Sequence, residues 1–263
     1  MSTTSSPGDR KLNLLLREWP RGAVVTQHRL NELGVYRQLV SKYARHAWVE
    51  KIGTGAYVRA GDAVDWRGGL FALQTELRMT AHIGAETALT YLGFAHFIPL
   101  GARQRVLLVS NQSEQLPAWF RQHPWKADLI HHCLALFERI PNDASSHLDC
   151  HGFRVTMSSA ERAIMEQLRL AQTNDEISHA IELMSGLVLL RPHVVQALLE
   201  ACRSIKVKRL FLWSAEAAGH SWLDRLDLRK VTLGAGKRLL YKGGRLDTKY
   251  GITVPRSEEV PDV

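Results

Sequence analysis

The order of short elements between residues 9 and 59 constrains this chain more than any other feature. Apolar residues recur there at helical spacing and predict three helices, over Asp9–Trp19, Gln27–Leu33 and Tyr36–His46. Two short β-prone runs around Gly53-Thr54-Gly55 then predict a β-hairpin. A helix, a second helix, a tight turn at Gly34, a third helix and a hairpin form the order of a winged helix-turn-helix.

The third predicted helix has one polar face opposite its apolar stripe of Tyr36, Leu39, Val40, Tyr43 and Ala47. Side chains of this kind read base edges in a major groove, because Arg and Gln present paired donors or acceptors. A basic face on a single helix is also compatible with an ordinary solvated surface, but the surrounding turn and hairpin favour DNA recognition. The predicted reading face consists of Arg37, Gln38, Ser41, Lys42 and Arg45.

Two neighbouring segments are predicted to contact the DNA backbone. The second helix begins after a predicted N-cap, Thr26, and free amides at a helix N-terminus suit a phosphate. The hairpin would act as the wing beside the third helix. These segments contribute Thr26, Gln27, His28 and Arg29 from the helix start, and Lys51, Thr54 and Tyr57 from the wing.

Net charge is distributed unevenly along the 263 residues. The formal charge is +8, with 45% hydrophobic and 23% charged residues, a balance typical of a globular chain. Residues 1–66 and 203–256 carry an excess of Lys and Arg, whereas residues 67–202 are nearly neutral. Clustered basicity is expected of a protein with a polyanionic ligand. The three cysteines, the lack of an apolar run of about 20 residues and the lack of a signal-peptide core predict a cytoplasmic protein without membrane contact.

The remaining chain predicts a larger mixed domain, which makes the fold class α+β. A glycine-containing linker is expected over Ala60–Gly69. Strands are expected near Arg105–Ser110, Leu129–Phe137 and Phe153–Met157. Helices are expected over Leu70–Met79, Ala85–Leu92, Ser159–Leu170, Asp175–Met184, Pro192–Cys202 and Lys206–Ala217. The predicted organisation is a disordered tail (1–8), a winged helix-turn-helix (9–66), a larger α/β domain (67–256) and an acidic tail (257–263).

The segment Lys230–Val254 alternates apolar and polar residues between glycine turns and predicts two or three basic strands. It could form a second contact surface for DNA, RNA or an acidic partner, or simply a solvated sheet face. Its cations are Lys230, Lys237, Arg238, Lys242, Arg245 and Lys249.

Several of these segments together resemble AbiEi-type antitoxins of type IV toxin–antitoxin and abortive-infection loci. The resemblance covers Gly22–Val58, Thr80–Ile98, the strand "RVLLVSN" and "VTMSSAERAIMEQL" at Val155–Leu168. It implies a winged helix followed by an antitoxin domain. It further implies repression of the protein's own operon through double-stranded operator repeats, and counteraction of a nucleotidyltransferase-like toxin, directly or only functionally.

An enzyme that processes nucleic acid and uses the winged helix for targeting is the alternative. The sequence offers no catalytic set, because it shows no paired carboxylates, no nucleophile elbow around Ser158-Ser159 and no P-loop at Gly234-Ala235-Gly236. We predict no cofactor and no metal ion, since the spacing of one mixed cluster fits no zinc motif. That cluster is His131, His132, Cys133, His147, Cys150 and His151.

Overall fold

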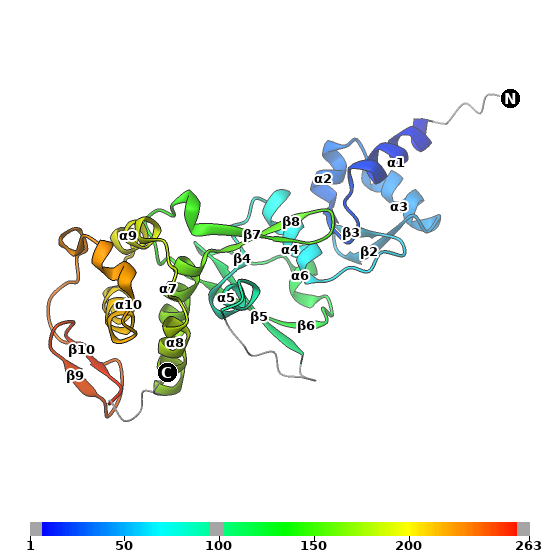
Figure 1. The fold of residues 1–263 in the computed structure, drawn as a ribbon. Helices are drawn as coiled ribbons and strands as arrows, with labels where there is room; N and C mark the ends of the chain where they lie inside the picture. Colours follow the sequence, from blue (N-terminus) through cyan, green and yellow to red (C-terminus); the bar gives the residue numbers. More distant parts are fainter. Residues whose placement is uncertain (1–6, 95–102, 257–263) are drawn as a thin grey trace.

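The computed structural model describes residues 7–94 and 103–256, and the chain is elongated (Figure 1). A small N-terminal part lies at one end, a mixed sheet lies in the middle, and a helical layer with a short hairpin lies at the other end. Most of the predicted N-terminal tail, the whole acidic tail and part of the Thr80–Ile98 resemblance fall outside the described residues.

The N-terminal part has the predicted order of elements. The turn after α2 forms as expected, because Gly34 adopts a positive φ of 70° and the Val35 amide bonds back to the Leu30 carbonyl at 2.8 Å. Thr26 is the N-cap of α2, as predicted, and its hydroxyl accepts from the Arg29 amide. The elements are α1 (Pro7–Glu18), β1 (Val25–Thr26), α2 (Gln27–Glu32), α3 (Arg37–Arg45), β2 (Val49–Gly53) and β3 (Ala56–Arg59).

Two residues of the predicted apolar stripe are exposed, Tyr36 at the start of α3 and Ala47 beyond its end. Tyr36 is 65% exposed, because it is the N-cap of α3 and its extended backbone turns the ring away from the core. Val40 and Tyr43 are the buried residues of the helix, and the Tyr43 ring contacts Trp48 at 5.6 Å between centroids. The core contact of α3 is therefore narrower than the predicted stripe.

The small antiparallel sheet β1-β3-β2 belongs to two hydrophobic cores at once. Side chains alternate between the faces of a strand. On one face, Val25 and Val49 pack with the three N-terminal helices. On the other face, Val24, Ala56 and Val58 pack with the core of the larger domain. The predicted wing is consequently a shared layer between the two parts of the protein.

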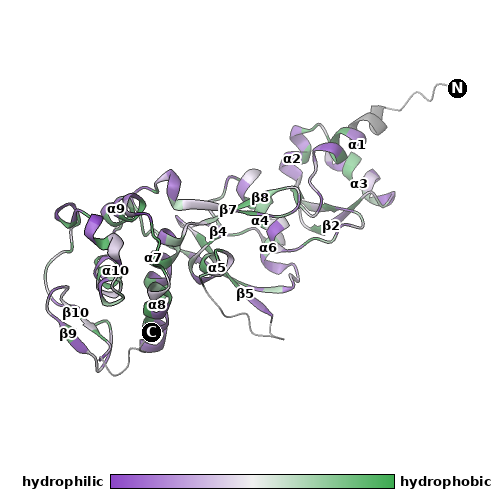
Figure 2. Cartoon of the chain, in the orientation of Figure 1, coloured by the Kyte–Doolittle hydropathy of each residue, from purple (hydrophilic) through white to green (hydrophobic). Residues whose placement is uncertain are grey.

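The larger domain is built on a five-stranded sheet of order β6-β5-β4-β8-β7. Strand β5, the predicted buried run, pairs in parallel with β6, and β4 pairs in parallel with β8. Helix α5 packs against β5, and its sequence alternates apolar residues such as Ala88 and Leu89 with polar ones (Figure 2). The elements are α4 (Trp66–Thr75), β4 (His82–Ile83), α5 (Ala85–Tyr91), β5 (Gln104–Ser110), α6 (Ala118–Gln122), β6 (Ala127–Cys133), η1 (Asn142–Ala144), β7 (Ser145–Asp149) and β8 (Arg154–Ser158).

The prediction of a linker over Ala60–Gly69 is wrong at its second half. Trp66 begins α4 and is 4% exposed, and both glycines that suggested flexibility lie inside that helix. A Cβ at Gly68 would lie 1.9 Å from the Gly22 carbonyl oxygen, and one at Gly69 would lie 2.8 Å from the Phe120 ring. These glycines permit close packing of α4.

A layer of four helices follows the sheet, close to the predicted ranges, and a basic C-terminal segment covers it. The predicted strands of that segment reduce to two strands of three residues, paired antiparallel. Arg209 fixes the segment by donating to the carbonyls of Leu233, Gly234, Gly236 and Gly251. The elements are α7 (Ala160–Leu170), α8 (Asn174–Ser185), α9 (Pro192–Ala201), α10 (Ile205–Ala217), η2 (Ser221–Arg225), η3 (Leu228–Lys230), β9 (Arg245–Asp247) and β10 (Ile252–Val254).

Candidate DNA-binding surface

The outer face of α3 carries the predicted reading residues together. Arg37, Gln38, Ser41, Lys42 and Arg45 are all exposed, while the opposite face of the helix is buried. Within residues 7–94 and 103–256, none of the three cations on this face takes part in an ion pair. The cations therefore face water and could reach a polyanion.

One residue of this face already has a local partner. The Ser41 hydroxyl donates to the Arg37 carbonyl at 2.9 Å, a bond back to the preceding turn that leaves its lone pairs outward. Near the end of α3, His46 Nδ1 lies 2.8 Å from the Lys42 carbonyl, and the His46 and Trp48 rings lie 5.6 Å apart. These contacts fix the end of α3 but do not engage its cationic groups.

The expected phosphate site at the start of α2 is not supported. Thr26 and Gln27 are 4% and 8% exposed. The Thr26 amide donates to the Glu76 carboxylate at 2.7 Å, and the Gln27 amide donates to the Gly55 carbonyl at 2.8 Å. Glu76 thus supplies the anion for this helix N-terminus from a distant part of the sequence. Its burial raises its pKa in spite of the bonds from Thr26.

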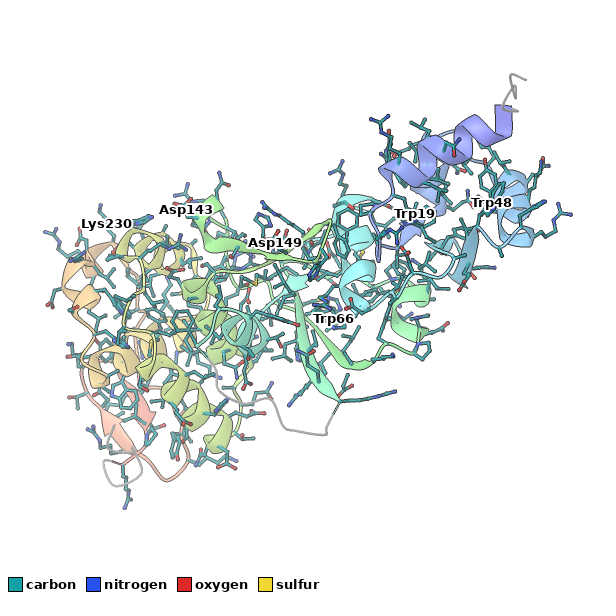
Figure 3. The ribbon with its side chains drawn as sticks, turned by 45° about the vertical axis from the view of Figure 1, so that its right-hand side comes forward. Trp19, Trp48, Trp66, Asp143, Asp149 and Lys230 are labelled. Carbon is teal, nitrogen blue, oxygen red and sulfur yellow. The ribbon has the colours of Figure 1, made fainter. Side chains whose placement is uncertain are left out.

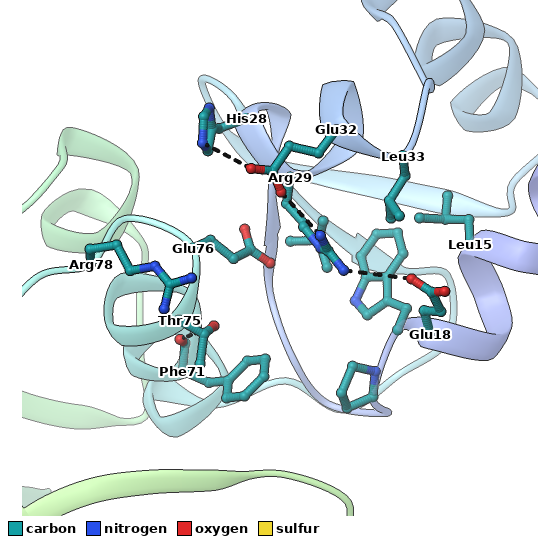
Figure 4. Close-up of a pocket in the computed structure, with 13 residues that line it drawn as sticks. Leu15, Glu18, His28, Arg29, Glu32, Leu33, Phe71, Thr75, Glu76 and Arg78 are labelled. Atoms are coloured by element: carbon teal, nitrogen blue, oxygen red, sulfur yellow. Dashed lines mark hydrogen bonds and ion pairs between the residues drawn. The ribbon is translucent and has the colours of Figure 1, made fainter.

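Arg29 is partly exposed but is paired with carboxylates of α1 and α2. Its guanidinium pairs with Glu32 at 3.0 Å and with Glu18 at 3.5 Å (Figure 4). These groups line a cavity of about 420 Å³ between α1, α2 and α4, which Glu76 also borders. His28 is exposed and lies 3.4 Å from Glu32. Of the four residues predicted at the start of α2, His28 and Arg29 reach solvent, and both lie beside the Glu32 carboxylate.

The predicted wing contributes two exposed residues and one internal residue. Lys51 and Thr54 are exposed, Lys51 on strand β2 and Thr54 in the hairpin turn. Tyr57 is half-buried, and its hydroxyl donates to Gln27 Oε1 at 3.3 Å. Tyr57 therefore connects the hairpin to α2, and we retain only Lys51 and Thr54 as candidate DNA contacts on the wing.

The basic C-terminal residues do not form one surface. Lys230 ends η3 at the edge of the helical layer, apart from β9 and β10 (Figure 3). Lys249 pairs with Glu216 at 2.5 Å. Tyr241 and Tyr250, the tyrosines of this segment, are 8% and 6% exposed, so their rings are not available to stack on bases. The remaining exposed cations are Lys237, Arg238, Lys242 and Arg245.

A buried ionic network in the larger domain was missed by the sequence reasoning. Glu166 is 1% exposed and accepts from Ser158 Oγ at 2.8 Å, Arg162 Nε at 2.8 Å and the Ala85 amide at 3.0 Å. Burial disfavours the carboxylate, but the charge of Arg162 and these donors outweigh it and lower the pKa of Glu166 to about 2. The spacing of Arg162 and Glu166 on one helix was the available signal.

Neither serine before α7 makes a side-chain cap bond to the helix. Ser159 occupies the N-cap position without a side-chain cap bond, and Ser158 instead joins the network around Glu166. His82 completes the network, with Nδ1 lying 2.8 Å from the Thr80 carbonyl and Nε2 lying 2.7 Å from Arg162 Nη2. The same Nε2 lies 3.1 Å from Glu166 Oε1, so the ring contacts both members of the buried Arg162–Glu166 pair.

The mixed histidine and cysteine cluster is dispersed over two strands, β6 and β7, and the turn after β7. His131 Nε2 lies 2.8 Å from Ser110 Oγ, and burial lowers the His131 pKa. Over the described residues, no group of three or more metal-ligating side chains comes together, and no helix is long and apolar enough to cross a membrane. The three cysteines are unpaired with one another.

The fold and the exposed face of α3 together define a two-part α+β protein whose N-terminal part has the element order of a winged helix-turn-helix. The chain belongs to the AbiEi family. Residues 8–100 match the model for the N-terminal domain of the AbiEi antitoxin, a transcriptional regulator, and residues 103–255 match the model for the AbiEi transcriptional regulator and antitoxin of type IV toxin–antitoxin systems. The resemblance identified from the sequence is confirmed.

A solved structure shows the same fold across nearly the whole chain. The RV2827C protein from Mycobacterium tuberculosis matches with a TM-score of 0.52 and 14% sequence identity, over 92% of this chain and 89% of that one. No curated protein matches the chain. The family description is that of a regulator and antitoxin rather than an enzyme.

Proposed function

We propose that the protein binds double-stranded DNA in a sequence-specific manner and represses its own toxin–antitoxin operon at operator repeats. The observation that carries this proposal is the exposed face of α3, whose Arg37, Lys42 and Arg45 lack ion-pair partners among the described residues. In a winged helix, this face enters the major groove. The family description as a transcriptional regulator supports the same assignment.

Different residues on this surface have different expected roles. Arg37 and Gln38 lie in the first turn of α3, where a reading helix meets base edges, and each good bidentate contact is worth about 1–3 kcal/mol of discrimination. Lys42, Arg45 and the wing residue Lys51 would contact phosphates, which adds affinity for any sequence.

The protein also counteracts a nucleotidyltransferase-like toxin under this proposal, with the larger domain as the active part. The family description as a type IV antitoxin supports it. The toxin could be bound directly or opposed only through its target. Expression of the full chain from an independent promoter should relieve growth arrest by the toxin encoded beside it, even when α3 can no longer bind DNA.

Operator binding is tested by measuring affinity for the upstream region and for unrelated DNA as salt is varied. Arg37→Ala or Gln38→Ala should relax the preference for the operator. Lys51→Ala should weaken binding to all sequences alike and reduce the salt slope by about one. Absence of binding by the unchanged protein at low salt would refute the proposal, and equal effects of all three variants on every sequence would refute the division of roles.

A further inference from the structure

The predicted wing does not project freely, because its turn rests on a helix of the larger domain. A Cβ at Gly53 would lie 2.6 Å from Trp119 Cβ and 3.0 Å from its Cα. Trp119 lies on α6 and is 7% exposed. Strand β2 and α6 are therefore in contact at the level of the backbone.

Helix α6 is also fixed from its other side. The Phe120 ring lies 5.6 Å from Trp119 and 5.5 Å from Trp125, and Gly69 of α4 abuts Phe120 and Trp125. The Trp125 indole donates to the Phe120 carbonyl at 2.7 Å. This packing of three aromatic rings holds α6 against the wing and the core.

The aromatic packing leaves the polar side of α6 exposed. Arg121 and Gln122 are exposed, as is Lys126 just before β6. Arg121 Nε donates to the Leu116 carbonyl at 2.9 Å, which fixes the stem of the side chain. In the described part of the chain, neither Arg121 nor Lys126 has an ion-pair partner. Asp128 is the nearest carboxylate to Lys126 along the chain, and Glu50 precedes Lys51 on β2.

Figures 1 and 3 both show α6 beside β2, on the side of the molecule that carries α3. When a reading helix lies in the major groove, neighbouring elements contact the flanking phosphates and fix the protein's register on the duplex. In this protein the wing tip is bordered by α6. Cations fixed at that place would face the DNA backbone.

We propose that Arg121 and Lys126 form a second phosphate-contacting element, so that DNA is held across the boundary between α3 and the larger domain. This inference rests on the proposed function, because it needs a duplex on α3. The ligand chemistry is the phosphate backbone of double-stranded DNA, read without regard to base sequence.

Salt-dependent binding by the full chain tests this element. Each lost phosphate contact lowers the salt slope by about 0.9 and, near 0.15 M salt, weakens binding about fivefold. The double variant Arg121→Ala/Lys126→Ala should therefore have a salt slope smaller by about two. It should bind operator and unrelated DNA alike about 30-fold more weakly. Lys126→Ala alone, which breaks no hydrogen bond or ion pair among the described residues, should show about half of the slope change.

A matched control comes from the far end of the larger domain. Arg139 is exposed, and its neighbour Glu138 bonds through its amide to the Ala201 carbonyl at the end of α9, away from the wing. Arg139→Ala should leave the salt slope unchanged. Thermal unfolding of Lys126→Ala and Arg139→Ala should match that of the unchanged protein, since these side chains are exposed and make no hydrogen bond or ion pair among the described residues. The double variant also loses the bond to the Leu116 carbonyl, so its salt slope is measured well below its own unfolding temperature.

The outcomes separate the two proposals. If the unchanged protein binds the upstream DNA and the double variant keeps its slope, the α6 contact is refuted while the α3 site stands. If Arg139→Ala lowers the salt slope as much as Lys126→Ala does, the α6 contact is also refuted, because the effect would then come from net charge. If the unchanged protein binds no DNA, the proposed function itself fails.

Discussion

Replacing Glu166 by Gln should expose how much the larger domain depends on one buried charge. The substitution keeps the shape of the side chain but removes the negative charge that faces Arg162, which is 2% exposed. It also places an NH2 group among the donors of Ser158, Arg162 and Ala85. Breaking a buried pair in this way leaves an uncompensated charge and typically costs about 3–5 kcal/mol.

The pKa of Glu166 gives a second estimate of how much its charge stabilises the folded state. The folded protein lowers the pKa of Glu166 from 4.5 to about 2. At about 1.36 kcal/mol per pKa unit, the ionised carboxylate stabilises the folded state by about 3 kcal/mol at neutral pH. Because the folded pKa is depressed, this contribution is complete above pH 4.5 and is lost as the pH falls toward 2. At pH 3 about 1.4 kcal/mol of it remains.

Urea unfolding followed by circular dichroism at pH 7 and pH 3 measures this contribution. Glu166→Gln should be less stable than the unchanged protein by about 3 kcal/mol at pH 7, and the gap should narrow by about 2 kcal/mol at pH 3. Glu138→Gln is the control, since Glu138 is exposed. A gap of equal size at both pH values, or one below about 1 kcal/mol at pH 7, would refute the assignment.

Two further substitutions test contacts that hold the parts together. Gly53→Ala forces a methyl group onto Trp119 and should lower the free energy of unfolding by about 1–3 kcal/mol. Gly186→Ala, at a helix end with φ of −74° and 3.6 Å of space, should be nearly neutral by the same denaturation assay. Arg209→Met removes the donors for four carbonyls and should make residues 232–254 at least about tenfold more sensitive to trypsin. Unchanged proteolysis would contradict this view of the C-terminal segment.

Local patterns in the sequence were sufficient to predict the N-terminal part and most helices. The third helix, its preceding turn and the hairpin depend on spacing and glycine positions within 30 residues, which a sequence displays directly. Strands β4 and β7 could not be predicted in this way. His82–Ile83 is too short to show a period, and Ser145–Asp149 is polar and becomes a strand only through pairing with β8.

The candidate site was predictable where exposure follows from helical periodicity, as on α3. It was not predictable at the start of α2, because the partner of the Thr26 amide is Glu76, a residue 50 positions away. Glycine was misleading at Gly68 for a similar reason. Its lack of a side chain indicated flexibility, whereas in the fold it permits contact with the backbone of Gly22.

The alternation of side chains in the small sheet has a mechanical consequence for the whole molecule. Val25 and Val49 belong to the N-terminal core, whereas Ala56 and Val58 belong to the core of the larger domain. A shift of the sheet relative to either part would expose apolar surface at about 25 cal/mol per Å². Since α3 packs on β2 and α6 packs on Gly53, the predicted reading helix and the larger domain are held in a fixed relation. DNA bound on α3 therefore meets the larger domain at a place set by the fold.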